Sequence, residues 1–212
     1  MRSIIFANGE YGDINSYAGL FREDDLIICA DGGANYAFEL GVMPSMIIGD
    51  MDSILPEVKE YFLNSGVEIN QYPRRKDFTD TQIALNIAEK AGADEIIQLG
   101  TLGKRPDHTL TNIYSGIEFA RRNIQISHFS PDCTIYLVTK ELEISGHAGD
   151  TVSILTLTEK SSGVTLTGFE YPLDNVVLDI SQPHTVSNVL TEDKGRIRVA
   201  EGVLTVFCVG MI

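Results

Sequence analysis

Two carboxylates stand close together in the sequence where an apolar run ends. Residues 46–48 are Met-Ile-Ile, and Asp50 and Asp52 follow in the segment Gly-Asp-Met-Asp-Ser. Carboxylates at this spacing are typical of divalent-cation sites, and an oxygen-only ligand set favours Mg²⁺ or Mn²⁺ over zinc. A solvated turn, in which an aspartate caps the next helix, explains the pattern equally well. Asp50 and Asp52 are therefore candidate metal ligands that need support from other residues.

Charges of both signs crowd residues 74–80, which read Arg-Arg-Lys-Asp-Phe-Thr-Asp. A helix-like pattern follows, and Thr79 or Asp77 is suited to cap it. Cations beside carboxylates are what a metal–phosphate site requires, because carboxylates hold the ion while Lys76 and its neighbours neutralise phosphate oxygens. The structural alternative is a capping box preceded by a charged loop. The segment favours phosphate chemistry and adds Asp80 to the candidate carboxylates.

A glycine-containing loop, Gly-Thr-Leu-Gly-Lys-Arg-Pro-Asp-His, begins at Gly100. Gly100 and Gly103 allow close backbone approach to a ligand. Lys104 and Arg105 supply positive charge, and Asp107 is suited to bind a metal or to orient a base. The spacing is not that of a P-loop, which has four residues between its glycines and Ser or Thr after its lysine. The loop therefore predicts phosphate binding without that motif.

A further polar motif, Asp31 with Gly32 and Gly33, follows the apolar run 26–30. Two glycines at a strand-to-helix turn commonly serve only geometry, so the motif alone is modest evidence of binding. In an open α/β sheet, however, ligands bind at the carboxyl ends of the strands. We therefore expect the loops that follow residues 30, 48 and 99 to converge there.

Short apolar runs alternate with helix-like segments over the first 130 residues. Runs bounded by turn residues predict buried parallel strands, and the alternation predicts an α/β sheet with helices on its faces. The expected strands are 3–7, 26–30, 46–48, 96–99 and 124–129, and the expected helices are 80–91 and 110–122.

The pattern changes near residue 131. Beyond it we find no convincing helix, and short runs rich in Val, Ile, Leu and Thr predict an antiparallel β domain, either a sandwich or a barrel. The expected strands are 134–138, 142–145, 151–157, 176–178, 186–190, 197–200 and 203–209. We therefore expect a Rossmann-like α/β/α domain over residues 1–130 and an all-β domain over residues 131–212.

The composition limits the possible partners. Lys and Arg total 16 and Asp and Glu total 30, so the formal net charge is −14, and such a surface repels nucleic acid. No apolar run approaches the roughly 18 residues of a membrane span. Three widely separated cysteines fit neither a disulfide framework nor a paired-cysteine zinc site. We expect a cytoplasmic protein without a nucleic-acid or membrane partner.

Taken in order, these motifs resemble those of the thiamine pyrophosphokinase family, also called thiamine diphosphokinases. The matching segments are Asn-Gly-Glu at 8–10, Ala-Asp-Gly-Gly-Ala-Asn at 30–35, Gly-Asp-Met-Asp-Ser at 49–53, Lys-Asp-Phe-Thr-Asp at 76–80 and the loop 103–108 with Asn112. In the β half, Tyr-Pro-Leu at 171–173 and Ser-Asn at 187–188 also resemble family positions. The resemblance covers nearly the whole chain, and the order and spacing of the motifs make it specific.

The resemblance implies a reaction, a cofactor and an assembly. The β,γ-pyrophosphoryl group of ATP would pass to the hydroxyethyl oxygen of thiamine, giving thiamine diphosphate and AMP, and Mg²⁺ would be required. Residues 1–130 would form the catalytic, ATP-binding domain and residues 131–212 the thiamine-binding domain. The protein would be a homodimer in which two subunits share each active site.

The resemblance also implies roles for single residues. The metal ligands would be Asp50, Asp52 and Asp80. The catalytic residues would be Asp52, Asp77, Asp80 and Arg105. The ATP-side binding residues would be Asp31, Gly32, Gly33, Lys76, Thr79, Gly103 and Asp107. The thiamine-side residues would be Ser187 and Asn188.

The chain departs from the family pattern at two points. Family members often carry Gly-Gly-Arg or Gly-Arg where this chain has Gly-Lys-Arg-Pro, and Pro106 makes the loop stiffer. Some members place a Trp beside thiamine, and this chain has none. Another group must therefore supply that packing.

Two other functions stay open from the sequence. The segment from Asp50 to Ser53 resembles the nucleophile motif of haloacid dehalogenase-type phosphatases, although it follows the third apolar run and not the first. A non-catalytic module that binds nucleotide and metal is the second alternative, because binding and catalysis share ligands.

Overall fold

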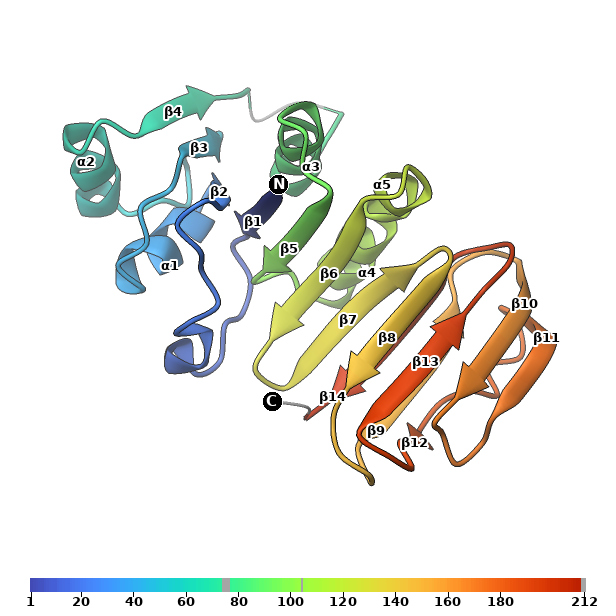
Figure 1. The fold of residues 1–212 in the computed structure, drawn as a ribbon. Helices are drawn as coiled ribbons and strands as arrows, with labels where there is room; N and C mark the ends of the chain where they lie inside the picture. The colour runs from blue at the N-terminus through green and yellow to red at the C-terminus, as the bar shows by residue number, and fades with distance from the viewer. Residues whose placement is uncertain (74–76, 104, 211–212) are drawn as a thin grey trace. The chain divides into compact units, whose positions relative to one another are not determined.

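The structure, a computed structural model, describes residues 1–73, 77–103 and 105–210. It is a mixed α/β protein with one large sheet and a separate antiparallel sheet. The chain divides into two compact units, Met1–Phe119 with His128–Ser130, and Ala120–Ser127 with Pro131–Ile212. Figure 1 shows the elements of both units coloured along the chain.

Parallel strands form the centre of the first unit. These strands are β1 (Arg2–Phe6), β2 (Leu26–Ala30), β3 (Met46–Gly49), β4 (Glu68–Gln71) and β5 (Glu95–Leu99). They pair in the order β5-β1-β2-β3-β4. Because β2 and β5 flank β1 on opposite sides, the strand order reverses at β1. Ligands of open α/β sheets bind at such a reversal, outside the carboxyl ends of the strands.

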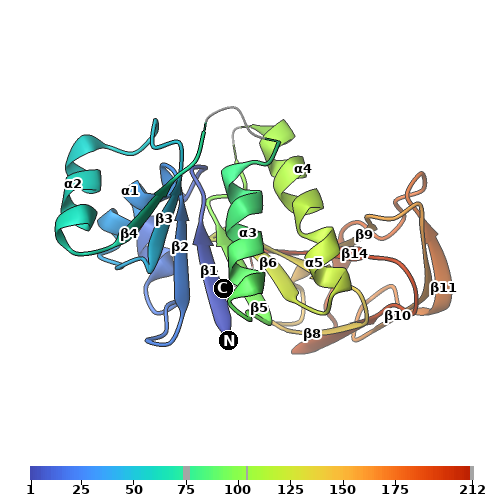
Figure 2. The same cartoon turned by 90° about the horizontal axis from the view of Figure 1, so that it is seen from above.

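Helices cover both faces of this parallel sheet (Figure 2). On one face, α1 (Gly33–Glu39) and α2 (Pro56–Asn64) share a hydrophobic core with Phe6 and Ile47. On the other face, α3 (Asp80–Lys90) packs against β1, β2 and β3. The remaining helices are the 3-10 helix η1 (Ile14–Tyr17), α4 (Pro106–Ser115) and α5 (Ile117–Arg121).

The predicted elements of the first half are mostly confirmed. Each apolar run predicted as a strand is a strand, including β6 (Gln125–Ser130), and the helix predicted at 80–91 is α3. The single helix predicted at 110–122 is wrong, because α4 begins earlier, at Pro106, and ends at the capping residue Gly116 before α5. The pattern also misses α1, α2 and β4. β4 reads Glu-Ile-Asn-Gln, a polar edge strand without an apolar run.

The second unit is built from antiparallel strands. In the large sheet it contributes β7 (Cys133–Val138), β9 (Thr151–Thr156), β12 (Asn188–Val189) and β14 (Leu204–Val209), in the order β12-β9-β14-β7. The separate sheet consists of β8 (Glu141–Ser145), β10 (Lys160–Thr167), β11 (Leu173–Asp179) and β13 (Lys194–Arg198), in the order β11-β10-β13-β8. One core joins buried side chains of both sheets, among them Val206 and Leu166. As predicted, no helix occurs in the described chain after β6.

The sequence pattern misses one strand of this unit. β10 begins with Lys-Ser-Ser-Gly, and this polar first half hides the strand. Each of the seven predicted runs overlaps a strand, although the run 186–190 forms only the two-residue strand β12 and the run 197–200 overlaps only the end of β13.

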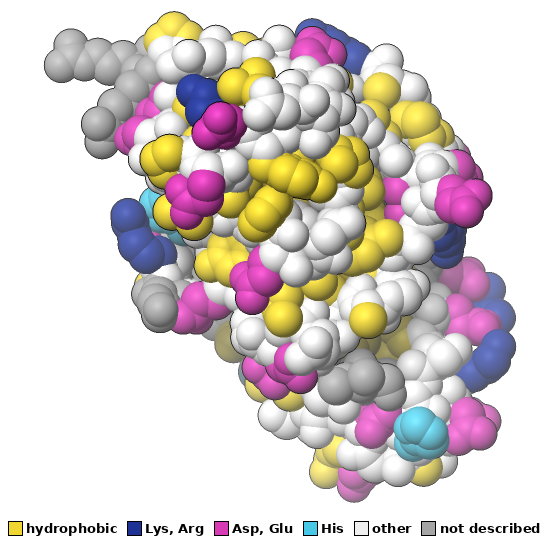
Figure 3. Space-filling model, turned by 90° about the vertical axis from the view of Figure 1, so that its left-hand side faces the viewer, with side chains coloured by type: hydrophobic (Ala, Val, Ile, Leu, Met, Phe, Trp, Pro, Cys, Tyr) yellow, Lys and Arg dark blue, Asp and Glu magenta, His cyan; other side chains and the backbone are white. Residues whose placement is uncertain are grey.

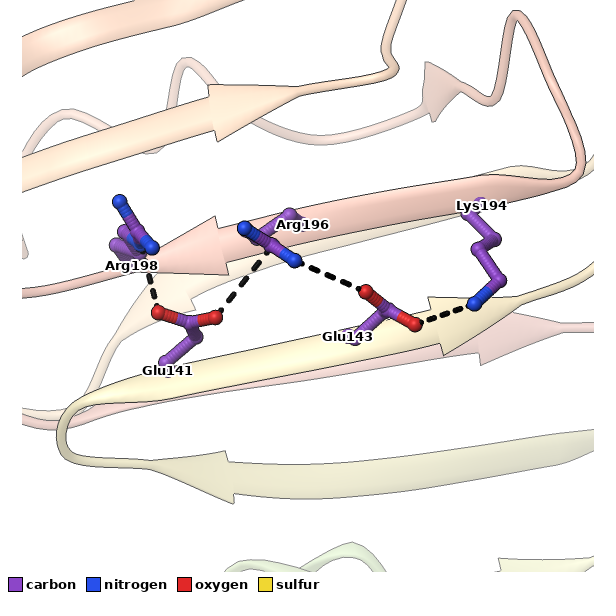
Figure 4. A network of polar contacts seen from close by, with 5 residues as sticks. All are labelled: Glu141, Glu143, Lys194, Arg196 and Arg198. Carbon is purple, nitrogen blue, oxygen red and sulfur yellow. Dashed lines mark hydrogen bonds and ion pairs between the residues drawn. The ribbon is translucent and has the colours of Figure 1, made fainter.

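A ladder of alternating charges joins β8 to β13 (Figure 4). Glu143 accepts from Lys194 at 2.7 Å and from Arg196 at 3.2 Å, while Glu141 accepts from Arg198 at 2.6 Å. Arg196 also lies 3.4 Å from Glu141, so it bridges the two carboxylates. β8 is an edge strand, and charged side chains on an edge disfavour pairing with another chain.

Hydrophobic side chains also reach the surface of the first unit. Phe38 on α1 and Tyr61 on α2 are 42% and 46% exposed, and their rings meet edge to face with centroids 4.9 Å apart. Figure 3, which looks onto the side of Figure 1 where α1 and α2 lie, shows hydrophobic side chains grouped beside acidic ones. In the part of the chain that the structure describes, no helix is long and apolar enough to span a bilayer.

Candidate active site

A cavity of about 700 Å³ opens at the carboxyl ends of the parallel strands in the first unit. Its walls come from the loops after β1, β2, β3 and β5 and from the first turns of α3 and α4. Asp31, Ser53 and Gly100 represent the three loops that the sequence predicts to converge. That convergence is confirmed, and it occurs at the reversal of strand order beside β1.

Two loops of the cavity touch through their backbones. A Cβ added to Gly9, after β1, would lie 2.1 Å from the carbonyl oxygen of Gly100, after β5. Glu10 donates its N–H to the carbonyl of Leu102 at 3.3 Å, and a Cβ at Gly103 would lie 2.6 Å from the Glu10 carboxylate. No larger residue than glycine fits these contacts, so the loops are held at a fixed separation.

The Gly-Gly turn after β2 packs against β1 in the same way. A Cβ on Gly33 would lie 2.1 Å from the carbonyl oxygen of Phe6, and one on Gly32 would lie 2.5 Å from the Asn8 side chain. The geometric interpretation of these glycines is thus sufficient to explain them. Their contribution to ligand binding stays a prediction.

Three carboxylates form a cluster beside the cavity. Asp31, Asp50 and Asp52 each offer an oxygen, and these oxygens lie within 4.8 Å of one another. Burial raises the pKa of Asp31 against hydrogen bonds from Ser53, and the nearby charge of Asp50 raises it further. The Asp31 Oδ1 atom is buried and has no hydrogen-bond partner among the described residues. An unpartnered buried oxygen on one member of a three-carboxylate cluster is an arrangement that a cation stabilises.

The backbone presents these carboxylates in a strained form. Asp31 has φ 49° and Met51 has φ 67°, a region that non-glycine residues seldom occupy. The Asp52 N–H donates to Asp50 Oδ1 at 3.2 Å, which makes a turn, but the predicted aspartate cap of the next helix is wrong, because α2 has Leu55 as its N-cap without a side-chain hydrogen bond. Asn35 on α1 anchors the loop by donating to the Ser53 carbonyl at 3.0 Å. The turn and the carboxylate cluster therefore coexist, and neither excludes the other.

The start of α3 contains the capping box that was the structural alternative for residues 74–80. Thr79 Oγ1 accepts from the Gln82 N–H at 3.2 Å, and the Gln82 side chain accepts from the Thr79 N–H at 2.9 Å. This is the predicted capping box. Asp80 lines the cavity and lies outside the group formed by Asp31, Asp50 and Asp52 among the described residues.

The other predicted residues of this segment are placed differently. Asp77 is exposed and is not among the described residues that line the cavity. Lys76 and Lys104 lie outside the described residues.

Arg105 stands at the entrance to α4 and pairs with Asp107. Its Nε and Nη2 atoms donate to the two Asp107 oxygens at 3.1 and 2.6 Å. Both side chains are about two-thirds exposed, at 66% and 64%, and Arg105 lowers the pKa of Asp107 to about 2. Both residues line the cavity, so this bidentate pair sets the direction of the guanidinium there.

Ser187 and Asn188 lie in the second unit. Asn188 is 3% exposed, and its side chain accepts from the Tyr171 N–H at 3.0 Å and donates to the Tyr171 carbonyl at 2.9 Å. Ser187 is exposed at φ 58°, and its N–H donates to Ser153 Oγ at 2.9 Å. Asn188 therefore shapes the loop that carries the exposed ring of Tyr171.

Sequence reasoning from single motifs misses several cavity residues. Tyr36 lines the cavity and stacks on the buried Tyr11, with ring centroids 3.9 Å apart. Thr101 also lines it, although it is 3% exposed. The helical spacing around Tyr36 is the signal that could have revealed Tyr36, and the position of Thr101 in the predicted phosphate-binding loop is the signal that could have revealed Thr101.

The fold and the cavity define a mixed α/β protein with a polar ligand site at the carboxyl edge of a parallel sheet. Residues 17–128 match the family model described as "Thiamin pyrophosphokinase, catalytic domain", and residues 136–204 match "Thiamin pyrophosphokinase, vitamin B1 binding domain". The chain therefore belongs to the thiamin pyrophosphokinase family.

Individual relatives agree with this assignment. The chain is 34% identical to thiamine pyrophosphokinase 1 of Oryza sativa subsp. japonica, over 81% of this chain and 74% of the relative. It is 29% identical to thiamine pyrophosphokinase of Bacillus subtilis, over 94% of each chain. The crystal structure of the Bacillus subtilis enzyme superposes with a TM-score of 0.88 at 27% identity and covers 100% of both chains. That of thiamin pyrophosphokinase from Geobacillus thermodenitrificans gives 0.84 at 26% identity, with 99% and 97% covered.

Proposed function

We propose that this protein transfers the pyrophosphoryl group of ATP to the hydroxyethyl oxygen of thiamine, giving thiamine diphosphate and AMP. The observation that carries the proposal is the carboxylate cluster of Asp31, Asp50 and Asp52 beside a polar cavity. The cluster and most of the cavity lining lie in the segment that matches the family's catalytic domain, and residues 7–10 of the lining precede it. Relatives of similar length bear the name of this activity.

The cluster fits a divalent cation. Its donors are carboxylate oxygens only, which hard cations such as Mg²⁺ prefer, and Asp31 Oδ1 is buried without a partner in the described chain. We propose that Asp31, Asp50 and Asp52 hold Mg²⁺, with Asp80 on the pyrophosphate side of the cavity. When bound, Mg²⁺ neutralises charge on phosphate oxygens and orients them.

The chain's own groups complete the phosphate site in this proposal. The first turns of α3 and α4 face the cavity, and helix N-termini attract anionic oxygens. Arg105 adds a guanidinium group at the same edge, and the Asp107 carboxylate that pairs with it balances its charge until a phosphate oxygen competes for the same N–H groups. The thiamine hydroxyl oxygen attacks the β-phosphorus, the bond from that phosphorus to the α-bridging oxygen breaks, and AMP leaves while the hydroxyl proton passes to a base. Asp77, Lys76 and Thr79 stay candidates for the edge of this site.

We further propose the division of labour between the domains. Residues 1–130 would form a Rossmann-like ATP-binding domain, supported by the parallel strand order and by helices on both faces. Residues 131–212 would form a thiamine-binding β-sandwich, supported by the core shared between two antiparallel sheets and by the match to the vitamin B1 binding domain. Ser187 and Asn188 would act on the thiamine side, within a homodimer that shares its active sites.

A product assay tests the proposed function. Purified protein is mixed with MgATP and thiamine, and the products are resolved by phosphorus NMR. Thiamine diphosphate and AMP in equal amounts are expected. ADP with thiamine monophosphate would replace the proposal with a one-phosphate kinase, and phosphate release independent of thiamine would favour a phosphatase. Sedimentation at working concentration tests the dimer, and a strict monomer would contradict a shared site.

A further inference from the structure

A chain of buried polar side chains runs beneath the cavity. His128, on β6, and Gln98, on β5, are both fully buried, and Thr101 is 3% exposed. None of the three is among the site residues that the resemblance implies. Buried polar groups destabilise a fold unless they are hydrogen-bonded. These three side chains contact one another, and the Gln98 Oε1 atom has no hydrogen-bond partner in the described part of the chain.

The contacts within this chain are directional. Thr101 Oγ1 lies 2.9 Å from His128 Nδ1, and the amide nitrogen of Gln98 lies 3.5 Å from His128 Nε2. An amide nitrogen can only donate, so with this orientation of the Gln98 amide Nε2 accepts and Nδ1 carries the ring hydrogen, whereas the opposite amide orientation and tautomer would reverse both roles. With the Gln98 amide as it stands, the Nδ1–H group donates to Thr101 Oγ1. The hydroxyl of Thr101 keeps its own hydrogen for another acceptor.

The ring that makes these contacts is neutral at physiological pH. Burial lowers the pKa of His128 to about 4. A neutral imidazole carries a single N–H, so it can donate a hydrogen bond to only one neighbouring group. Here that neighbour is Thr101.

Thr101 is held on its other side as well. Asn112, on α4, donates to the Thr101 carbonyl at 3.0 Å. The preceding residue, Gly100, has φ 63°, and a Cβ there would lie 2.6 Å from the carbonyl of Ala7. The backbone of the loop is thus fixed. The degree of freedom that Thr101 keeps is the direction of its hydroxyl hydrogen. Thr101 and Asn112 both line the cavity.

We propose that His128 is a positioning residue: it holds Thr101 so that the hydroxyl hydrogen of Thr101 faces the cavity and donates to a phosphate oxygen of ATP. This inference rests on the proposed function, because it needs a phosphorylated substrate in the cavity. His128 itself touches no substrate.

Kinetics of four variants test the proposal. His128→Leu removes the donor, whereas His128→Asn keeps an N–H near the place of Nδ1. Thr101→Val removes the hydroxyl, whereas Thr101→Ser keeps it. We expect the Leu and Val variants to lose about tenfold to hundredfold in kcat, the range for one hydrogen bond to a charged group. The Asn and Ser variants should stay within about threefold of the wild type, with the KM for thiamine unchanged in all four.

The double variant separates positioning from packing. If His128 acts through Thr101, adding His128→Leu to Thr101→Val lowers kcat no further. Losses that multiply would overturn the proposal, and so would full activity in Thr101→Val. Should His128→Leu not fold, the contrast between Val and Ser at position 101 still decides whether the hydroxyl acts.

A spectroscopic readout tests the hydrogen position without any activity. The ¹⁵N shifts of the His128 ring at pH 7 should report the Nδ1-protonated tautomer, with the signals assigned by their loss in His128→Asn. An Nε2-protonated ring would overturn the proposal, because the Thr101 hydroxyl would then donate its hydrogen to Nδ1 and could not donate it to a ligand. Wild-type protein that makes no thiamine-dependent AMP would instead contradict the proposed function, and this is measured before any variant.

Discussion

Asp31 and Asp52 follow different strands, β2 and β3, yet their carboxylate oxygens lie within 4.8 Å of each other, together with one from Asp50. The approach depends on Gly49, because a Cβ there would lie 2.9 Å from the Asp31 Cβ. Three carboxylates this close repel one another unless protons or a cation intervene. The pKa of Asp31 is raised mainly by its burial, and the charge of Asp50 adds a smaller contribution in the same direction.

Neutralising one member of this cluster should separate stability from activity. Asp52→Asn should lower kcat on the order of a hundredfold or more, because it removes a proposed ligand of the metal that orients phosphate. The melting temperature without metal should stay the same or rise, since a mutual repulsion is relieved. Turnover at several Mg²⁺ concentrations and thermal unfolding measure the two effects. Glu60→Gln, which changes an exposed carboxylate on α2, is the control and should alter neither.

The sequence predicts the strands that carry this cluster but not its membership. Buried strands such as β1 and β3 contain apolar runs, Ile-Ile-Phe and Met-Ile-Ile, so they can be predicted without a structure. β4 and the first half of β10 are polar, and only their pairing partners make them strands. Asp31 joins Asp50 and Asp52 because β2 and β3 are neighbours, a fact of sheet order that no local pattern contains. The contact of His128 with Thr101 is equally non-local.

Arg105 should be irreplaceable by lysine. Its Nε and Nη2 atoms donate to both oxygens of Asp107 in a bidentate pair. An ammonium group cannot reproduce this planar, two-donor geometry. Arg105→Lys should therefore lose most of kcat, on the order of a hundredfold, while the melting temperature is unchanged because the pair is exposed. Steady-state kinetics with varied ATP measure the loss. A lysine variant with near-wild-type kcat would remove Arg105 from the phosphate site.

A buried ion pair near the N-terminus should dominate the acid stability of the first unit. Arg2 donates to both Asp25 oxygens at 2.7 Å, and the Asp25 side chain has 0% exposure. Burial tends to raise the pKa of Asp25, but hydrogen bonds from Arg2 and from the Arg22 N–H outweigh it, so the pKa lies below its usual value. The stabilisation is therefore present above the ordinary aspartate pKa near 4 and is lost as pH falls through the lower folded-state value.

Removing that carboxylate should be costly at neutral pH. Asp25→Ala leaves the Arg2 charge buried without its partner and should reduce the free energy of unfolding by about 3 to 5 kcal/mol. Urea denaturation at pH 7 and at pH 3 measures it, and the difference from wild type should shrink at the lower pH. Asp94→Ala, which breaks an exposed pair with the N-terminal amine at 2.8 Å, should leave stability unchanged.

The charge ladder of β8 and β13 should respond to salt more strongly than a buried pair, because its side chains are exposed to the screening ions. The variant Glu143→Gln loses the ion pairs that Glu143 makes with Lys194 and Arg196. The melting temperature of this variant should fall slightly below that of the wild type at low ionic strength. The difference should vanish near 1 M NaCl, where screening acts over about 3 Å. A gap that persists in high salt would mean that packing, and not charge, accounts for the ladder.

Substitution of Asn188 should change the KM for thiamine and not the KM for ATP. The buried Asn188 amide holds both backbone groups of Tyr171, and that loop carries a ring that is 64% exposed. Asn188→Ala leaves these groups unpaired and should reduce stability by about 1 to 3 kcal/mol. Because the chain has no Trp, an exposed Tyr171 is a candidate for packing on thiamine, so the KM for thiamine should rise while the KM for ATP is unchanged.

Tyr171→Phe and Tyr171→Ala complete the argument about this loop. Phe keeps the ring and should retain the thiamine KM, whereas Ala removes it and should raise the KM as Asn188→Ala does. If Tyr171→Ala leaves the KM unaltered while Asn188→Ala raises it, then Asn188 acts through another part of its surroundings. If both variants raise the KM for ATP as well, the second unit contributes to the nucleotide site, and the proposed division between the domains is wrong.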